Sequence, residues 1–460
     1  MADALPEPAN RSPGWDLQLA APERRRQVLF ICADPVGEEM AGLGIRNWEL
    51  AHVLREHADV TIAHGGSEAR DQQGIRTVHY RPHAPDSLKP LISHADVVVA
   101  HPQWPLVTRW LRRSRARVIF DLYDPETLET LELLAGRPAI ARRALTATTI
   151  DRLHDSLRTG HHFMCAAENQ RDLWLGAMLA LRLIGPDSYD RDPSLRSVID
   201  VVPFGLPEQP PEGGATDGLR ERLPQLEPED EVVLWNGGIW RWLDAPTAIR
   251  SVAALARRRP RVRLVFMGGG GDHPAAARSA RDARELAREL GVLGSTVIFH
   301  DVWVPYAERA AWLTQANCAL SCAREHLETR FAFRTRLLDC LWAGLPIVCT
   351  SGDDLAARVD RDDLGAVAGP GDVGGLADAI ERVLDRGRTA YTERLAAAAA
   401  EYTWSQVARV LVSWVLDQGA PARPGDCATA LARPAAQRMR ELAYLGAVRP
   451  FLARRRPGAR

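Results

Sequence analysis

Short apolar runs alternate with helical segments along most of the chain, and this repetition limits the possible folds more than any other feature. Each run lacks the polar–apolar alternation of a half-exposed strand, so it predicts a strand covered on both faces. Such strands separated by helices predict a parallel α/β architecture. The runs are 27–33, 59–64, 96–101, 117–124, 161–166 and 197–205 in the first half, and 231–238, 261–271, 296–305, 317–323 and 345–353 in the second.

The segment 206–218, LPEQPPEGGATDG, interrupts this alternation and is typical of a linker, because proline and glycine break regular structure. The sequence therefore predicts two Rossmann-like domains facing across a cleft, with ligands at the carboxyl ends of the strands. The expected divisions are a disordered segment at 1–22, an N-terminal domain at 23–205, a linker at 206–230, a C-terminal domain at 231–403, and C-terminal helices with a basic tail at 404–460 that pack back on the N-terminal domain.

The composition is that of a globular protein of two or three domains, with 460 residues, 46% of them hydrophobic, and a formal net charge of −1. That charge gives no electrostatic reason to expect nucleic acid as a partner. The seven cysteines lack a CxxC pair, so we expect buried free thiols and a cytoplasmic protein. The polar N-terminus does not fit a signal peptide, and no run of about 18 apolar residues predicts a membrane span.

Residues 437–460 form a basic tail, with seven arginines against one glutamate and apolar residues between them. A basic amphipathic segment can lie on an anionic surface, so one interpretation is peripheral contact with the inner face of the plasma membrane. The other interpretation is a helix docked on the N-terminal domain and followed by a basic end. The sequence leaves both open.

Polar residues follow three strands of the first half at the point where each strand ends. His101 follows one strand, Asp121 and Asp124 end the next, and Glu168 follows the strand after that. These side chains can face one cleft, where they would hold substrate hydroxyls or support a general base. The alternative for the carboxylates is helix capping. The Asp-x-x-Asp spacing lacks further histidine or glutamate ligands, so we expect no metal site.

Glycine pairs stand between a strand and a helix in both halves. Gly42 and Gly44 precede the first helix, and Gly237 and Gly238 end the first strand of the second half. Glycine lets the backbone approach a ligand closely, and helix N-terminal amides can bind an anion there. The spacing does not fit the fingerprint of dinucleotide dehydrogenases, and the alternative is that the glycines only shape turns. Arg241 follows between two tryptophans, which either contact a ligand or pack between the domains.

The stretch RFAFRTRLLD at 330–339 places two arginines at the start of a predicted helix. Arg334 and Arg336 can donate charge-assisted hydrogen bonds to phosphate oxygens, and the apolar residues around them indicate burial, where an arginine needs a partner. Asp339 lies one turn further along, where it can accept hydrogen bonds from a diol such as ribose. Glu328 precedes the arginines in a loop. The pattern predicts a bound nucleoside diphosphate.

The second half resembles the donor domain of GT-B glycosyltransferases of the retaining, GT4-like type. The resemblance covers about 231–386 and rests on the order of the Gly-Gly strand, RVRLVFMGGGG, RLLDCLWAGLPIVCTSGD and GPGDVGGLADAIERVL. The first half agrees more loosely, through MAGLGIRNWELAHVL and VVVAH. The signatures suggest a bacterial subgroup.

The resemblance implies that a nucleotide-diphosphate sugar binds mainly to the C-terminal domain. Its base would lie near Trp303 and Val304, and Asp339 would hold the ribose in place of the second glutamate of the family's E-x7-E motif. The N-terminal domain would bind the acceptor, with His101 and Asp121 brought to the donor sugar when the domains close.

Two departures from the family pattern affect the expected site. Phe331 stands where the first glutamate of E-x7-E belongs, so Glu328 is a candidate substitute from an altered loop. The arginine and lysine that usually follow the Gly-Gly strand are displaced, so the diphosphate contact is assigned to Arg334 and Arg336.

The implied reaction is transfer of a glycosyl group to an acceptor hydroxyl with retention, without a metal or other cofactor and without a protein nucleophile. Asp124 and Glu168 are the candidates for binding the acceptor, which would be a glycan, a lipid-linked molecule or a natural product. Two alternatives stay open: a GT-B nucleotide-sugar 2-epimerase, and a non-catalytic GT-B protein that activates a partner.

Overall fold

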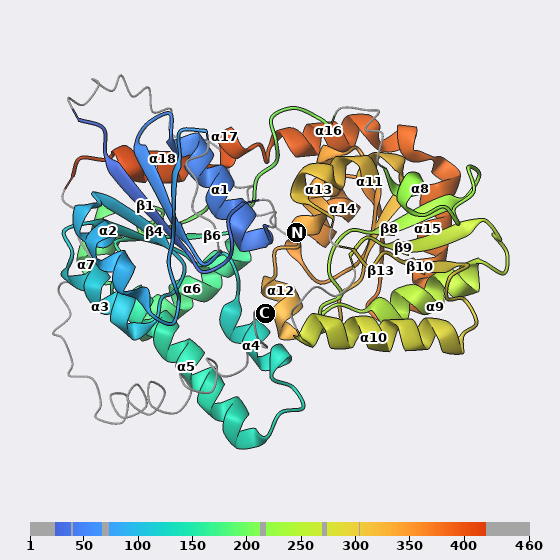
Figure 1. Cartoon of the computed structure of the whole chain (residues 1–460), viewed down its shortest axis with the longest axis horizontal. Coiled ribbons are helices and arrows are strands. Elements are labelled where there is room, and N and C mark those ends of the chain that lie inside the picture. Colours follow the sequence, from blue (N-terminus) through green and yellow to red (C-terminus); the bar gives the residue numbers. More distant parts are fainter. Residues whose placement is uncertain are drawn as a thin grey trace, which may run out of the picture.

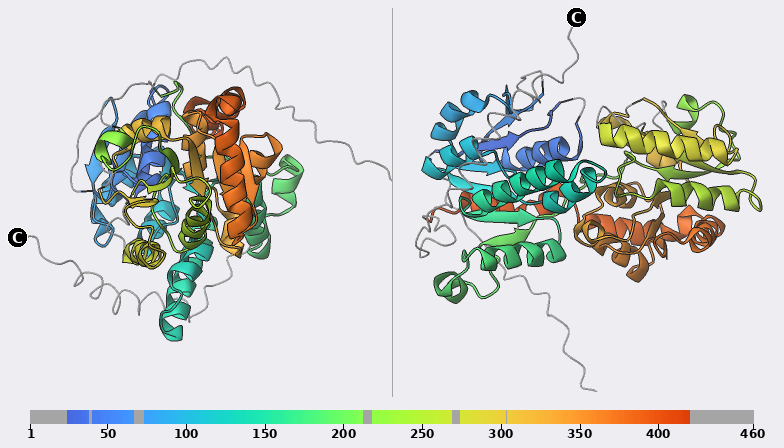
Figure 2. Two further views of the ribbon diagram at one scale, coloured as in Figure 1. Left: turned by 90° about the vertical axis from the view of Figure 1, so that its right-hand side faces the viewer. Right: turned by 90° about the horizontal axis from the view of Figure 1, so that it is seen from below.

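The computed structural model of the chain forms two α/β lobes side by side (Figure 1). It describes residues 24–37, 40–66, 73–211, 218–268, 274–302 and 304–419. Three predictions fall outside the described residues: the N-terminal segment 1–22, Trp303 as a contact of the base, and the basic tail at 437–460. The views from the side and from below show that each lobe has its own sheet and helices (Figure 2).

The N-terminal lobe is built on a seven-stranded parallel sheet in the order β3-β2-β1-β4-β5-β6-β7. Every residue of β4 and β5 is buried, as expected for apolar strands that are covered on both faces. The strands are β1 Gln27–Cys32, β2 Asp59–His64, β3 Arg76–His79, β4 Val97–Ala100, β5 Arg117–Asp121, β6 His162–Cys165 and β7 Ile199–Val201.

The helices of this lobe connect successive parallel strands. Helix α1 packs against β1 and β2, and α4 packs against α5 and lies beside the second lobe (Figure 1). They are α1 Gly42–Leu54, α2 Leu88–His94, α3 Pro105–Arg113, α4 Glu126–Leu133, α5 Ala139–Leu157, α6 Glu168–Ala180 and α7 Pro186–Arg191, with a 3-10 turn at Pro85–Ser87.

The C-terminal lobe has a six-stranded parallel sheet in the order β10-β9-β8-β11-β12-β13. Its strands are β8 Glu231–Trp235, β9 Val262–Phe266, β10 Val297–Phe299, β11 Cys318–Ser321, β12 Ile347–Thr350 and β13 Gly365–Ala368. Its helices are α8 Leu219–Arg222, α9 Ala245–Leu255, α10 Pro274–Glu289, α11 Arg309–Gln315, α12 Leu327–Phe331, α13 Thr335–Trp342, α14 Asp354–Arg361, α15 Val373–Arg386 and α16 Thr392–Ala400, with 3-10 turns at Tyr306–Glu308 and Arg388–Tyr391.

The last two helices, α17 Trp404–Val407 and α18 Arg409–Leu416, carry the chain back to the N-terminal lobe (Figure 1). Leu206 and Thr403 form an isolated parallel bridge, so the two crossings of the chain between the lobes run side by side. On the N-terminal lobe, Arg117 donates a hydrogen bond to the Trp414 carbonyl oxygen and pairs with Asp417 at 3.0 Å. The end of the described chain is thereby fixed to the first sheet.

Each sheet reverses its strand order at one point, and the candidate site lies at these two points. In the N-terminal sheet β1 lies between β2 and β4, and in the C-terminal sheet β8 lies between β9 and β11. Loops leave in opposite directions at such a switch point, which opens a crevice at the carboxyl ends of the strands. The prediction of two Rossmann-like domains is confirmed.

Some predictions from composition can be compared directly with the structure. The six described cysteines are buried and free, so the expectation of buried thiols is confirmed for them. Among the described residues, no helix is both long and apolar enough to cross a bilayer. The same part of the chain contains no group of three or more His, Cys, Asp or Glu side chains placed to hold a metal ion.

Candidate active site

The turn after β8 forms one wall of the candidate site. Gly237 has a φ of +133°, which residues with a Cβ rarely adopt, so the turn requires glycine there. Arg336 of α13 approaches this turn, and its Nη2 donates a hydrogen bond to the Gly238 carbonyl oxygen at 3.2 Å. Asn236 Nδ2 donates to the Arg336 carbonyl oxygen at 2.7 Å. Both the backbone and the side chain of Arg336 are therefore fixed against the turn.

Arg336 carries a charge for which the described residues provide no counter-charge. Its Nη1 is buried and has no hydrogen-bond partner in the described part of the chain. Burial, and then the positive charge of Arg334, lower the pKa of Arg336 to about 10, so the group is still protonated at neutral pH. Because a buried charge needs a partner, this position is suited to an anion supplied by a ligand.

The tryptophans on either side of Arg241 pack against each other and against the core of the protein. The rings of Trp240 and Trp242 are stacked with centroids 5.2 Å apart, and both pack against the main hydrophobic core. A Cβ on Gly238 would lie 3.2 Å from Trp240 Nε1, so the stacked pair also limits the shape of the turn. Arg241 is half-buried.

Arg334 and Glu328 pair with each other. Arg334 Nη1 and Nη2 donate to the two carboxylate oxygens of Glu328 at 3.0 and 2.8 Å. Glu328 is only 2% exposed, and a carboxylate at that depth requires a counter-charge, which Arg334 provides. The sequence predicted Arg334 at the diphosphate and Glu328 at the substrate. In the structure, the Arg334 and Glu328 side chains bind each other instead.

Asp339 also has a partner from its own lobe. Its Oδ1 accepts a hydrogen bond from Arg309 Nε at 3.0 Å, and the Arg309 guanidinium lies between the rings of Tyr306 and Trp342, 3.5 and 4.5 Å from their centroids. The Asp339 side chain remains 25% exposed, so it is held in place without being enclosed. Val304, expected near the base, is buried close to the end of β10.

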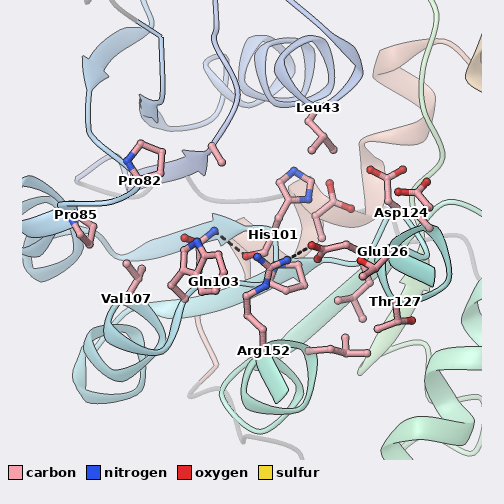
Figure 3. A pocket seen from close by; sticks show the side chains of 18 of the residues that line it. Leu43, Pro82, Pro85, His101, Gln103, Val107, Asp124, Glu126, Thr127 and Arg152 are labelled. Atoms are coloured by element: carbon pink, nitrogen blue, oxygen red, sulfur yellow. Dashed lines mark hydrogen bonds and ion pairs between the residues drawn. The ribbon is translucent and has the colours of Figure 1, made fainter. Parts of the chain in front are cut away.

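The N-terminal lobe contributes a pocket of about 350 Å³ at the carboxyl ends of β1, β4 and β5, bordered by α4 and α5 (Figure 3). His101, Asp121 and Asp124 all line it, so the structure brings these three predicted site residues together. His101 Nε2 lies 3.1 Å from Asn47 Nδ2, a contact that orients the ring.

Asp121 is held by Arg46 and is not available as a free carboxylate. Arg46 Nε and Nη2 donate to its two oxygens at 2.6 and 3.1 Å. The same guanidinium donates to the carbonyl oxygens of Val202 and Pro203 at 2.8 Å each. The pair therefore ties α1 and β5 to the segment that follows β7. Sequence reasoning expected a catalytic Asp121 and missed Arg46, an arginine inside an otherwise ordinary helical pattern.

The C-terminal lobe matches a known family. Residues 230–386 match the family described as glycosyl transferases group 1. This segment is therefore similar to a group 1 glycosyltransferase domain, and it is called the group 1 domain below. It spans β8 to α15 and thus contains the Gly237–Gly238 turn, the Glu328–Arg334 pair and Arg336. No match was found among curated protein sequences.

Solved structures share the whole two-lobed arrangement. WaaG, a glycosyltransferase involved in lipopolysaccharide biosynthesis, is 17% identical with a TM-score of 0.59, over 85% of this chain and 100% of that one. Sucrose-phosphate synthase from Thermosynechococcus elongatus is 15% identical with a TM-score of 0.60, over 85% and 98%. Anabaena Alr3699/HepE, solved with UDP-glucose, is 13% identical with a TM-score of 0.59, over 85% and 99%. These likenesses confirm the GT-B fold.

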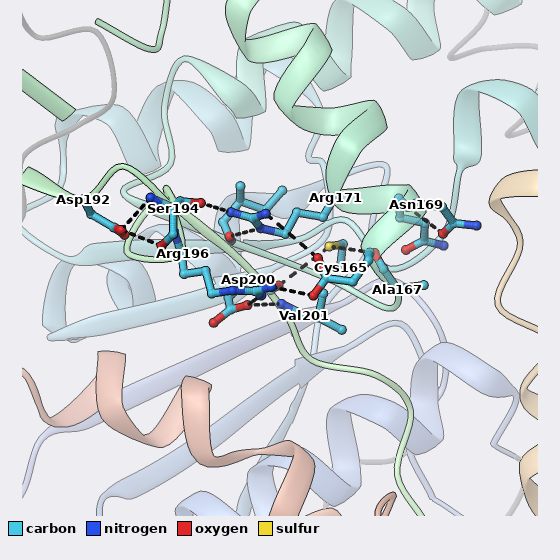
Figure 4. A network of polar contacts seen from close by, with 12 residues as sticks. Cys165, Ala167, Asn169, Arg171, Asp192, Ser194, Arg196, Asp200 and Val201 are labelled. Carbon is cyan, nitrogen blue, oxygen red and sulfur yellow. Dashed lines mark hydrogen bonds and ion pairs between the residues drawn. The ribbon is translucent and has the colours of Figure 1, made fainter. Parts of the chain in front are cut away.

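Glu168 lies outside the pocket of this GT-B protein. At the first position of α6, its side chain is 58% exposed and pairs with Arg196 at 2.6 Å. Arg196 also pairs with Asp200 in a polar network on the N-terminal lobe (Figure 4). The structure therefore does not place Glu168 with His101 and Asp124, because the first turn of α6 directs it to Arg196.

The next two residues of α6 connect the lobes, and sequence reasoning missed both. Asn169 Nδ2 donates to the Arg330 carbonyl oxygen, and Gln170 Nε2 donates to those of Phe331 and Tyr123 at 2.8 and 2.9 Å. Gln170 is fully buried. These bonds hold α12 of the group 1 domain against the N-terminal lobe, next to the pocket. A glutamine after a strand gives no sequence signal for such a contact.

The glycines before α1 allow a matched pair of substitutions. A Cβ on Gly44 would lie 2.3 Å from the Pro35 carbonyl oxygen, whereas a Cβ on Gly42 would have no atom within 4 Å. We expect Gly44→Ala to lower the free energy of unfolding by about 1–3 kcal/mol, because the backbone must shift, and Gly42→Ala to change it by less than about 0.5 kcal/mol. Urea unfolding of both variants checks this. Equal stability of the two would contradict the close approach at Gly44.

Proposed function

We propose that the protein is a retaining glycosyltransferase that moves a sugar from a nucleotide-diphosphate sugar to an acceptor hydroxyl. One observation carries the proposal: Arg336, a half-buried cation whose buried Nη1 has no partner among the described residues, lies on the Gly237–Gly238 turn at the switch point of the group 1 domain. The donor diphosphate would supply the missing counter-charge. Asp339, steadied by Arg309, would accept hydrogen bonds from the ribose.

The chemistry follows from where negative charge develops. The bond between the anomeric carbon and the diphosphate oxygen breaks, and the acceptor oxygen forms its bond on the same face of the sugar. The acceptor proton passes to an oxygen of the departing phosphate, so no protein nucleophile is needed. Arg336 stabilises the growing charge on the diphosphate more than the charge of the intact donor, and this difference accelerates the reaction.

We further propose that the reaction needs neither a metal ion nor another cofactor, because the Arg336 guanidinium takes the charge-neutralising role at the diphosphate. The expected result is full activity after treatment with EDTA. Activity that disappears with the chelator and returns with a divalent cation would overturn this part of the proposal.

The test of the reaction has two stages. A thermal-shift comparison of UDP, GDP, dTDP and ADP identifies the base, because a ligand at 100 times its Kd stabilises the folded state by about 2.7 kcal/mol. NMR then follows the corresponding nucleotide sugar with and without acceptors. Retention requires the product to keep the anomeric configuration of the donor, and an inverted product would overturn the proposal.

The same spectra separate the two alternative functions. A 2-epimerase would convert the donor sugar in the absence of any acceptor. A non-catalytic partner protein would bind the nucleotide and leave the sugar unchanged, without even slow hydrolysis. Either outcome would replace glycosyl transfer as the function.

A further inference from the structure

The pocket of the N-terminal lobe contains carboxyl groups of two kinds. Asp121 is paired with Arg46. Glu126 is paired with Arg152 (Figure 3). Asp124 and Glu129 line the same pocket, and their carboxylates form no ion pair or side-chain hydrogen bond with any described residue. The pocket therefore holds two more acidic groups than basic partners.

Both carboxyl groups are half-buried, so a negative charge on either of them is costly. Burial first, and then the negative charge of Glu129, raise the pKa of Asp124 well above its usual range. Burial and the charge of Glu328 raise the pKa of Glu129 to about 7, against a smaller opposing effect of Arg334. Since Arg334 is already paired with Glu328, it cannot neutralise Glu129 as well. A cation bound beside Asp124 and Glu129 would relieve both costs.

The rest of the pocket fits a small organic molecule rather than a bare ion. Its volume of about 350 Å³ lies at the lower end of the range of about 300–1,000 Å³ usual for small-molecule sites. Leu43, Val107, Leu133 and Trp174 provide apolar walls. Gln103 is 7% exposed, and its Nε2 donates to the His101 carbonyl oxygen, while its Oε1 accepts no bond from a described residue. That oxygen is available to a ligand hydroxyl.

The charges also exclude an anionic occupant. The arginines near the pocket are already committed: Arg46 to Asp121, Arg152 to Glu126, and Arg334 to Glu328. A phosphate or carboxylate in the pocket would find no free arginine among the described residues, and it would avoid repulsion only while both Asp124 and Glu129 are protonated. The absence of a free basic partner therefore disfavours an anionic ligand.

We propose that the acceptor carries a protonated amino group, which pairs with Asp124 and Glu129 while the rest of the molecule occupies the apolar part of the pocket. The inference rests on the proposed function, because it names the chemical class of the second substrate. α4, which carries Glu129, packs against α12 of the group 1 domain. An acceptor anchored by its amine at this edge is therefore held next to the lobe that binds the donor.

The test measures binding by the full chain without any donor. The probes are phenyl glucoside and the matched compound in which an amino group replaces its primary hydroxyl. We expect the amine to bind at least about tenfold more tightly in isothermal titration at neutral pH, since a hydrogen bond to a charged group is worth this much. Asp124→Asn and Glu129→Gln should each remove most of that preference.

Glu132→Gln is the matched control, because Glu132 is on the same helix and does not line the pocket. It should keep the amine preference, and thermal melting confirms that each variant is folded. Equal affinity for the two probes, no binding of the amine, or a preference that survives the Asp124→Asn/Glu129→Gln double variant would overturn the inference. Hydrolysis of the donor sugar by the unmodified chain is measured separately, so the inference and the proposed function can fail independently.

Discussion

Replacing Arg336 with methionine should lower kcat/KM for the donor sugar by about 100- to 1,000-fold, the effect of removing one group that stabilises developing negative charge. The basis is its position: Arg336 Nη2 is fixed to the Gly238 carbonyl oxygen, and Nη1 has no partner among the described residues. Most of the loss should appear in kcat, because the charge on the diphosphate grows in the transition state. Steady-state kinetics with saturating acceptor measures it.

Stability distinguishes this role from a structural one. Removing a half-buried cation that has no counter-charge should leave the unfolding midpoint unchanged or raise it, whereas loss of a structural arginine would lower it. Arg330→Met is the control, because Arg330 is an exposed arginine of α12 and should keep full activity. A change in kcat/KM below about threefold for Arg336→Met corresponds to less than about 0.7 kcal/mol and would remove Arg336 from the mechanism.

The sequence predicted the architecture well because buried parallel strands have a strong signature. All the strands expected from continuous apolar runs are present, from β1 to β12. β3 and β13 were not predicted, and both are edge strands of four residues. RTVH in β3 mixes polar and apolar residues, and GAVA in β13 contains a single β-branched residue, so neither has the run of β-branched residues typical of a central strand.

The candidate site was predicted only in part, and the two arginines show why. Residues two apart on a helix do not face each other, so Arg334 and Arg336 at the start of α13 cannot be expected to bind the same phosphate. This much could have been seen in the sequence. Which arginine pairs with Glu328 depends on how α12 folds back, and no local pattern shows that. No local pattern shows the Arg46–Asp121 pair either, because its two residues are 75 positions apart in the sequence.

Breaking the Glu328–Arg334 pair should be the most destabilising change in the candidate site. Glu328→Gln leaves a buried guanidinium without its counter-charge, and we expect the free energy of unfolding to fall by about 3–5 kcal/mol. Replacing both partners, with Glu328→Leu and Arg334→Met, removes the two charges together and should cost far less, because the hydrophobic replacements need no desolvated partner. Urea unfolding of the single and double variants gives the coupling between the two residues.

The double variant also decides between two roles for Arg334. If the ion pair is structural, the double variant should keep the donor nucleotide affinity of the unmodified protein, because Arg336 and the Gly237–Gly238 turn are untouched. If Arg334 left Glu328 to bind the diphosphate when the donor arrives, the same variant would be stable but would lose nucleotide affinity by tenfold or more. Nucleotide titration of a folded double variant therefore shows whether one guanidinium or two meet the diphosphate.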